Sequence, residues 1–191
     1  MNKIIFNPAF IFLWAVFFFT ACSTSDKYLK EVKQLESVLV IIDSSQINYK
    51  SVDTAKIRQY TAALNSNIAF VTEYNKHDTL TREQSQLVSE YSSSLRSFEV
   101  IIKQYKEVGQ ELLESKEQIE NLIHDLKIAK IEDAKVPVYV QDELIAEARA
   151  VRTAGIIVNS SKLNSEKFEK NNPKVSELIE LLKKKSNSNK H

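Results

Sequence analysis

The chain has 191 residues, with 26 lysines and arginines against 25 aspartates and glutamates, and contains only two glycines and three prolines. A formal net charge of +1 offers no basic excess for binding nucleic acid. The length suits one compact domain or one elongated bundle. So few glycines and prolines provide little turn punctuation for a sheet protein and favour helices.

An apolar segment follows a single lysine at the start of the chain. After Lys3, the run from Ile4 to Phe19 consists almost entirely of Ile, Phe, Leu, Ala, Val and Trp, interrupted by Asn7 and Pro8. A charged start and a short apolar run are typical of an export signal. The run is too short and too poorly flanked to be a good membrane-spanning helix. An ordinary secretory signal is one interpretation of this segment.

The end of the apolar run supports a second interpretation. Phe19-Thr20-Ala21-Cys22 resembles the lipobox of bacterial lipoproteins, in which the signal is cut before a cysteine that carries the lipid, although Phe19 departs from the usual branched aliphatic residue. Cys22 is the only cysteine and therefore has no disulfide partner within the chain. The resemblance implies attachment to a membrane through lipid on Cys22. With Ser23 rather than aspartate next, it also implies the outer membrane of a Gram-negative cell.

Cleavage before Cys22 would divide the chain into four parts. These are a removed signal peptide (1–21), a lipid-anchored tether (22–26), a helical bundle (27–182) and a disordered polar tail (183–191). Since residues 1–21 contain one lysine and no acid, the remaining 170 residues carry 25 basic and 25 acidic side chains. The only Trp, the only Met and six of the nine Phe also leave, so we expect a core of Leu, Ile, Val, Ala, seven Tyr and three Phe.

Helical spacing of apolar residues predicts two helices after the tether. The first carries a stripe of residues three and four apart: Tyr28, Val32, Leu35, Leu39 and Ile42. The second is predicted from about Asp53 to Tyr74, and its stripe consists of Ile57, Tyr60, Leu64, Ile68 and Val71. Residues 75–79 are expected to form the turn that follows.

A long central helix is predicted next. Thr81 and Gln84 have the spacing of a capping box at its start. Its apolar stripe repeats every 3.5 residues, interrupted by Ser94 and Ser115: Leu87, Tyr91, Phe98, Ile101, Tyr105, Val108, Leu112, Ile119, Leu122, Leu126 and Ala129. About fifty residues at 1.5 Å each make a rod on the order of 75 Å long.

The segment Val136-Pro137-Val138-Tyr139-Val140 is expected to end this helix, because a residue before proline prefers extended geometry. After a hairpin turn, a further helical stripe is predicted at Leu144, Ala148, Val151, Gly155 and Val158. Asn172-Pro173 has the cap and first-turn signature of a last helix, while residues 159–171 are polar and poorly periodic. The predicted fold is all-α, an elongated antiparallel helical bundle or coiled-coil hairpin with one long central helix.

The two glycines lie on predicted helical stripes, where each costs about 1 kcal/mol relative to alanine. In a hairpin that turns near Pro137, Gly109 and Gly155 fall at comparable distances from the turn. They could therefore allow the two helices to approach closely. A local bend in each helix is the alternative.

Residues suited to chemistry are scarce. His77-Asp78 and His124-Asp125 are adjacent pairs, and neighbours on a helix point about 100° apart, so neither pair forms a two-ligand metal face by itself. The chain has no zinc-protease, haem-attachment or glycine-rich phosphate motif and no Gly-x-Ser-x-Gly elbow. We therefore expect no enzyme, no catalytic residues, no metal site and no cofactor.

Two short motifs suggest surface modification. Asp53-Thr54-Ala55 and Asp78-Thr79-Leu80 each resemble the Asp-Ser/Thr-apolar sites that carry O-glycans in exported proteins of Bacteroidetes-type bacteria, which makes Thr54 and Thr79 candidate sites. Aspartate is also a preferred helix cap for structural reasons. Lys183, Lys184 and Lys185 are compatible with contact to anionic lipid or cell-wall polymer, or with a solubilising helix end.

The predicted function is a membrane-anchored, exported, non-catalytic lipoprotein with a structural or protein-interaction role in the cell envelope. Its partners would be the membrane, through lipid on Cys22, and a protein or a second copy, through a helical stripe. The alternative is a periplasmic helical bundle that binds a small ligand or inhibits an enzyme. An unexplained polar gap in the core, such as the one from Ser94 to Ser115, would favour that alternative.

Overall fold

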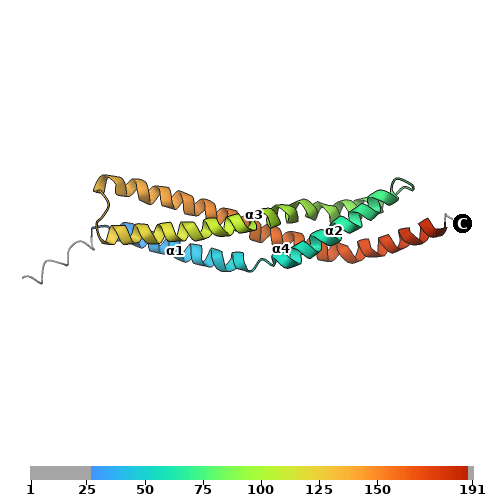
Figure 1. Ribbon diagram of the computed structural model, residues 1–191, viewed down its shortest axis with the longest axis horizontal. Helices are drawn as coiled ribbons and strands as arrows, with labels where there is room; N and C mark the ends of the chain where they lie inside the picture. Colours follow the sequence, from blue (N-terminus) through green and yellow to red (C-terminus); the bar gives the residue numbers. More distant parts are fainter. Residues whose placement is uncertain (1–26, 189–191) are drawn as a thin grey trace, which may run out of the picture.

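The computed structural model describes residues 27–188 as a rod of four α-helices (Figure 1). They are α1 (Leu29–Lys50), α2 (Thr54–Tyr74), α3 (Arg82–Lys127) and α4 (Val136–Ser188), with a short 3-10 turn, η2 (Asp133–Lys135), before α4. No strand occurs in residues 27–188. The predicted all-α, elongated antiparallel bundle with a long central helix is confirmed.

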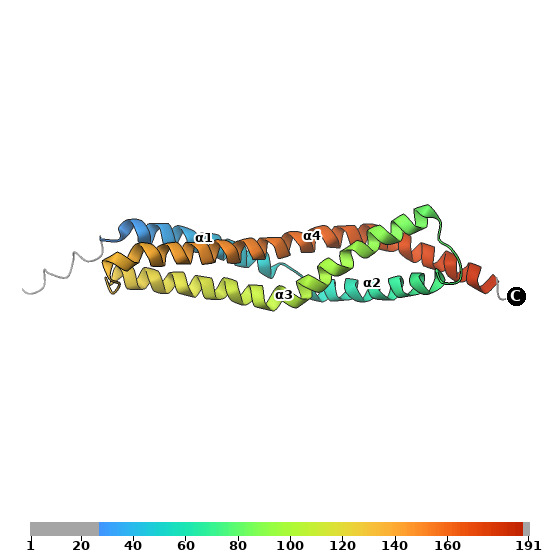
Figure 2. The ribbon, with the colours of Figure 1, turned by 90° about the horizontal axis from the view of Figure 1, so that it is seen from above.

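Three helices surround the core at each level of the rod. The antiparallel pair of α3 and α4 forms most of its length, and α1 and α2 follow one another along this pair (Figure 2). Each of the two short helices packs against both α3 and α4, and they do not pack against each other. The 46 residues of α3 alone span about 70 Å at 1.5 Å per residue.

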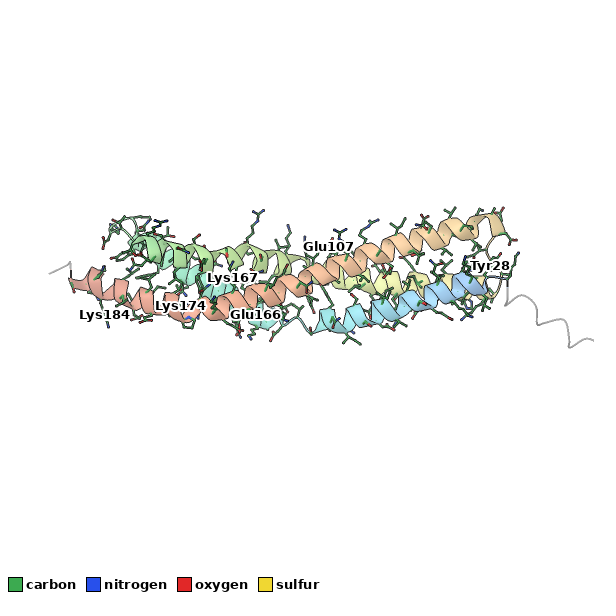
Figure 3. The ribbon with its side chains drawn as sticks, turned by 180° about the vertical axis from the view of Figure 1, so that it is seen from behind. Tyr28, Glu107, Glu166, Lys167, Lys174 and Lys184 are labelled. Carbon is green, nitrogen blue, oxygen red and sulfur yellow. The ribbon has the colours of Figure 1, made fainter. Side chains whose placement is uncertain are left out.

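The two ends of the rod differ in which segments they bring together. We call residues 27–33 and 124–142 the hairpin end, where α1 begins beside the turn between α3 and α4. We call residues 70–86 and 176–188 the far end, where the turn between α2 and α3 lies beside the end of α4. Tyr28 and Lys184 mark these opposite ends in Figure 3.

Local capping determines where α2 and α3 begin. The Asp53 carboxylate accepts a hydrogen bond from the Lys56 backbone N–H at 2.8 Å. At α3, the Thr81 hydroxyl accepts from the Gln84 N–H at 3.3 Å, and the Gln84 side chain accepts from the Thr81 N–H at 2.9 Å. These bonds satisfy backbone donors that have no partner within the helix, so the predicted capping box is confirmed.

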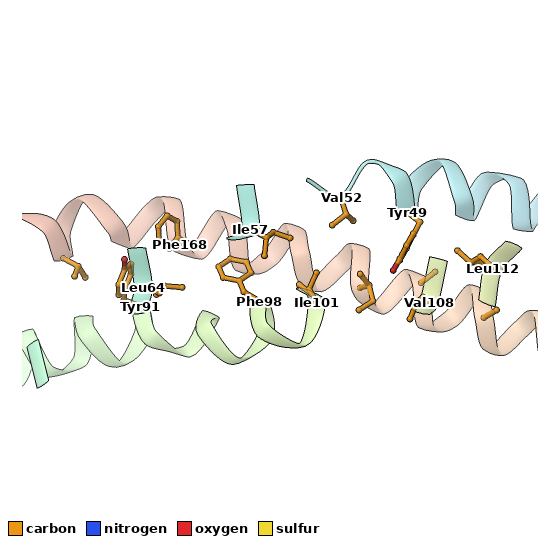
Figure 4. Packing of buried hydrophobic residues seen from close by; sticks show 14 of the residues in the cluster. Tyr49, Val52, Ile57, Leu64, Tyr91, Phe98, Ile101, Val108, Leu112 and Phe168 are labelled. Carbon is orange, nitrogen blue, oxygen red and sulfur yellow. The ribbon is translucent and has the colours of Figure 1, made fainter. Parts of the chain in front are cut away.

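The predicted stripes of α1, α2 and α3 face the core. Beside α1 the core is aliphatic, and Leu35, Ile42, Ile119 and Leu126 are almost fully buried there. Beside α2 it is aromatic, and Figure 4 shows Tyr91, Leu64 and Phe168 grouped together in this part of the rod. The serines that interrupt the α3 stripe, Ser94 and Ser115, are buried along with it.

The end of α3 is set by its own C-terminal hydrogen bonds and not by Pro137. Ala129 adopts a left-handed conformation with φ of 49°. The Lys130 N–H donates to the Asp125 carbonyl at 3.0 Å, and the Ala129 N–H donates to the Leu126 carbonyl at 3.1 Å. This pattern is the Schellman motif, which usually places glycine at the left-handed position.

The prediction of an extended break at 136–140 is therefore wrong. Val136 is helical, with φ of −54° and ψ of −48°, and Pro137 lies in the first turn of α4. Proline is tolerated there because an N–H at this position would have no helical partner. Burial of Val136 and Val140 in the aliphatic core favours the helical path.

The prediction that a last helix begins at Asn172-Pro173 is also wrong. Helix α4 passes through Pro173 without a break and includes residues 159–171. Phe168, Asn171 and Val175 are buried on one continuous face of α4. Packing of this face against the rest of the bundle overrides the local preference of proline for a helix start.

The predicted stripe of α4 also differs from the structure. Ala148 is exposed, and Glu147, Ala150, Ala154 and Ile157 are buried instead. The buried face is thus rotated by about one residue, roughly 100°, because small and polar residues occupy core positions on this helix.

The C-terminal end of α4 differs from the predicted tail. Helix α4 continues to Ser188, whereas the sequence predicts a disordered tail from residue 183. Residues 189–191 lie outside the described residues.

The two glycines do not face each other. A Cβ atom at Gly109 would lie 3.3 Å from Cε1 of Tyr49, whereas one at Gly155 would meet nothing within 4 Å. Tyr49 stacks on Tyr105 with ring centroids 4.6 Å apart and donates a hydrogen bond to the Tyr105 carbonyl at 2.6 Å. Burial raises the pKa of Tyr49 to about 12. The close approach at Gly109 therefore joins α1 to α3, and of the two alternatives for the glycines, the close contact of α3 with α4 through both of them does not occur.

Candidate functional site

The outer face of α4 carries a row of exposed apolar side chains. Val138, Ile145, Ile156 and Leu163 are 56%, 50%, 56% and 66% exposed. Their spacings of 7, 11 and 7 residues place all four within about 20° of one direction on an α-helix. This direction is opposite the buried face that contains Ala154. We call these four residues the α4 stripe.

Two arginines lie in the middle of the α4 stripe. Arg149 and Arg152 fall between Ile145 and Ile156, and both are exposed. Neither forms an ion pair with any residue between 27 and 188. A guanidinium group binds carboxylates in a planar, two-point geometry. The surface therefore combines four aliphatic contacts with two cationic groups available to an acidic partner.

The far end of the rod contains a surface hollow of about 590 Å³, which Phe70, Tyr74, His77 and Lys183 help to line. The Lys183 ammonium lies 5.7 Å from the centre of the Phe70 ring. Tyr74 donates a hydrogen bond to the Asp78 carboxylate, which lowers the pKa of that carboxyl group. The hollow thus presents both charge signs beside an aromatic ring.

A polar network joins three helices inside the far half of the bundle. Asn67 of α2 donates to the Tyr91 hydroxyl at 2.9 Å, and this hydroxyl donates to Asn172 of α4 at 2.8 Å. Burial raises the pKa of Tyr91. Buried polar groups whose hydrogen bonds are satisfied can specify one arrangement of a core. This network joins α2, α3 and α4, and it uses the donor and one acceptor position of the Tyr91 hydroxyl.

Ser94 and Ser115, the polar positions in the α3 stripe that would favour a ligand-binding core, lie in different surroundings. Ser94 is fully buried, and its hydroxyl has no hydrogen-bond partner. Ser115 lines a shallow hollow of about 170 Å³ between α3 and α4, beside Ala146 and Ala150. Neither serine lines the larger hollow at the far end.

Glu147 is a buried acid that the apolar pattern of the sequence did not indicate. It is 6% exposed, and burial raises its pKa. Glu143, one turn earlier, also has a raised pKa because of burial and the neighbouring Asp142 charge. Neither carboxylate forms an ion pair with a residue in the described part of the chain. Burial of Glu147 therefore disfavours the ionised form of its carboxyl group.

The structure separates the residues that the sequence singled out. Cys22 lies outside the described residues. Thr54 is the first residue of α2, next to the capping Asp53. Thr79 is exposed in the turn between α2 and α3, where its N–H donates to Asp78 at 2.8 Å. The candidate O-glycan sites thus occupy two different turns, and in both the aspartate makes a local backbone contact.

The histidines do not come together. His77 lines the hollow at the far end, and His124 is exposed near the C-terminus of α3. Within residues 27–188, no three His, Cys, Asp or Glu side chains are arranged to hold a metal ion. No helix in this range is both long and apolar enough to cross a membrane.

Comparison with known proteins found no matching family model, no matching curated protein and no matching solved structure.

Proposed function

We propose that this chain is an exported lipoprotein, anchored through lipid on Cys22, with a non-catalytic protein-interaction role in the cell envelope. The observation that carries the interaction role is the α4 stripe. Four large aliphatic side chains face solvent along one line, about half to two thirds of each being exposed. Exposed apolar groups that line up along a helix offer an anchor row to an amphipathic partner helix.

The two arginines indicate the chemistry of the partner. A helix that packs against the α4 stripe would bury its own apolar row and bring acidic residues to Arg149 and Arg152. A second copy of α4 in antiparallel orientation would instead place these arginines against each other. The geometry therefore favours a different, acidic amphipathic segment over self-association through this face.

The lipobox-like Phe19-Thr20-Ala21-Cys22 supports the anchor. Under the sorting pattern that this resemblance implies, Ser23 directs the protein to the outer membrane. Several acyl chains hold a protein stably, whereas one gives only marginal binding.

The anchor predicts the behaviour of a Cys22→Ala variant. Wild-type protein should sediment with membranes and enter the detergent phase, whereas the variant should lose nearly all membrane recovery because it lacks the thiol that carries the lipid. Cell fractionation and detergent phase partitioning measure both properties. A Ser23→Ala variant keeps the thiol and should behave like wild type. Equal membrane recovery of the Cys22→Ala variant and wild type would exclude the lipid anchor.

The interaction role predicts the behaviour of an Ile145→Glu/Ile156→Glu variant. Because both residues are exposed, each substitution should change the free energy of unfolding by no more than about 0.5 kcal/mol. Crosslinking in the native envelope should show loss of the partner. The matched control is Val40→Glu/Ile47→Glu on α1, where the side chains are 66% and 71% exposed. Retention of the same crosslinked partner by the α4 variant would show that the stripe is not the interaction surface.

A ligand-binding or enzyme-inhibiting bundle is the second candidate function. The hollow at the far end favours it, because Lys183, Asp78 and Phe70 offer charge and an aromatic face to one small molecule. A compound that binds there should raise the unfolding temperature of the wild type and not that of a Lys183→Ala variant.

A further inference from the structure

Exposed apolar side chains gather at the hairpin end of the rod. Leu29, Ile128, Val138 and Tyr139 are 46%, 54%, 56% and 45% exposed. They come from the start of α1, the end of α3 and the first turn of α4, segments that lie together at one end of Figure 1. Leu181 is the single exposed large apolar residue of the far end within the described chain. The hairpin end therefore exposes more large apolar side chains to its surroundings than the far end does.

The start of the described chain is attached to this apolar end. Tyr28 is buried, and its hydroxyl donates a hydrogen bond to Asp133 of η2. Lys27 forms an ion pair with the same carboxylate. These contacts fix the first residues of the bundle beside the turn between α3 and α4.

The length of the tether limits how far this end can lie from a lipid anchor. Lys27 is five positions after Cys22 in the sequence, and a fully extended chain spans at most about 3.3–3.6 Å per residue. Lipid on Cys22 would thus hold Lys27 within about 17 Å of the acylated residue. The far end of α4, by contrast, lies on the order of 80 Å away along 53 helical residues.

We infer that the hairpin end is a membrane-contact surface, on which Leu29, Ile128 and Tyr139 rest in the interface of the lipid bilayer. This inference rests on the proposed lipid anchor at Cys22. It adds the orientation of the rod: the turn between α3 and α4 lies against the membrane, and the turn between α2 and α3 projects away from it.

The side chains of the hairpin end suit the boundary between acyl chains and head groups. A tyrosine places its ring in the apolar layer and its hydroxyl in the polar layer. Residues 27–33 and 124–142 contain six lysines and five acidic residues, so this end is nearly neutral. Lysine stems can lie along apolar surface while the ammonium group stays in water. Contact of the hairpin end with the bilayer therefore depends more on insertion of apolar side chains than on attraction to anionic lipid.

Tryptophan fluorescence provides the test, because the chain has no tryptophan after Trp14. Three full-length variants, Tyr139→Trp, Ile47→Trp and Leu181→Trp, place one probe at the hairpin end, on the side of α1 and at the far end. Each protein is made in a bacterial host that acylates it and is reconstituted in phosphatidylethanolamine and phosphatidylglycerol vesicles with brominated acyl chains. Wild-type protein is the control, and it should show no tryptophan emission once residues 1–21 are removed.

We expect vesicle flotation of all three variants, with a blue shift and loss of emission in Tyr139→Trp alone. Adding Leu29→Ser and Ile128→Ser to Tyr139→Trp should weaken the quenching without changing flotation. Equal quenching of Ile47→Trp would mean that the rod lies on its side and would overturn the end-on contact. Flotation without quenching of Tyr139→Trp would refute the contact and leave the anchor in place. Failure to float would refute the anchor and the inference that rests on it.

Discussion

Replacing Leu112 by alanine is expected to lower the free energy of unfolding by about 2–5 kcal/mol. Leu112 is 1% exposed and belongs to the core that surrounds α3 beside Val108 and Ala150. The substitution removes buried apolar surface and leaves a cavity that neighbouring long helices can fill only in part. Urea titration followed by circular dichroism measures the change. The large expected effect follows from burial of this stripe inside the monomer.

The next residue provides a matched control. Leu113 is 45% exposed on the same helix, and Leu113→Ala should change the free energy of unfolding by no more than about 0.5–1 kcal/mol. The pair compares the same chemical change at a buried and an exposed position. Equal effects of the two substitutions would contradict the placement of Leu112 on the buried face of α3 and of Leu113 on its exposed face.

Replacing Pro173 by alanine is expected to raise the free energy of unfolding by about 1–3 kcal/mol. Pro173 lies inside α4, where it has no N–H to donate to the Glu169 carbonyl. It is exposed, so alanine restores this hydrogen bond without removing core contacts. The gain is reduced because the unfolded chain is more flexible without proline. Denaturant titration and the unfolding temperature both report the change.

Pro137→Ala is the control for this prediction. Pro137 lies in the first turn of α4, where a restored N–H would find no helical acceptor. Its replacement should leave the stability unchanged or lower it by up to about 1 kcal/mol. If Pro173→Ala behaves like Pro137→Ala, a helix begins at Asn172, as the local sequence suggested, and α4 is not continuous.

The elements that the sequence predicted correctly are those determined by local chemistry. Asp53, Thr81 and Gln84 satisfy backbone donors within three residues of themselves, so their role is visible in a short stretch of sequence. The α3 stripe is also local, because its period matches an α-helix over more than forty residues. Even Ser94 and Ser115 lie at the core positions that this period assigns to them.

The candidate site could be predicted only in part. Val138, Ile145, Ile156 and Leu163 have helical spacing in the sequence, but that spacing does not say whether the row faces the core or solvent. The answer depends on Ala150, Ala154 and Glu147, which occupy the buried face although none of them is a large apolar residue. Hydrophobic periodicity is a weak guide when small residues fill a core between closely packed helices.

The sequence by itself determined the helical class, the starts of α2 and α3 and the core face of α3, because each depends on contacts within a few turns of one helix. Only the tertiary structure decided that α4 passes through Pro173, that the Tyr49 ring packs against Gly109 and that the α4 stripe faces solvent. These outcomes depend on residues far apart in the chain. Tyr91 binds Asn172 across 81 positions, and Tyr105 stacks on Tyr49 across 56. The free energy of such packing exceeds the local preference of a proline or a glycine, which is worth only about 1–3 kcal/mol.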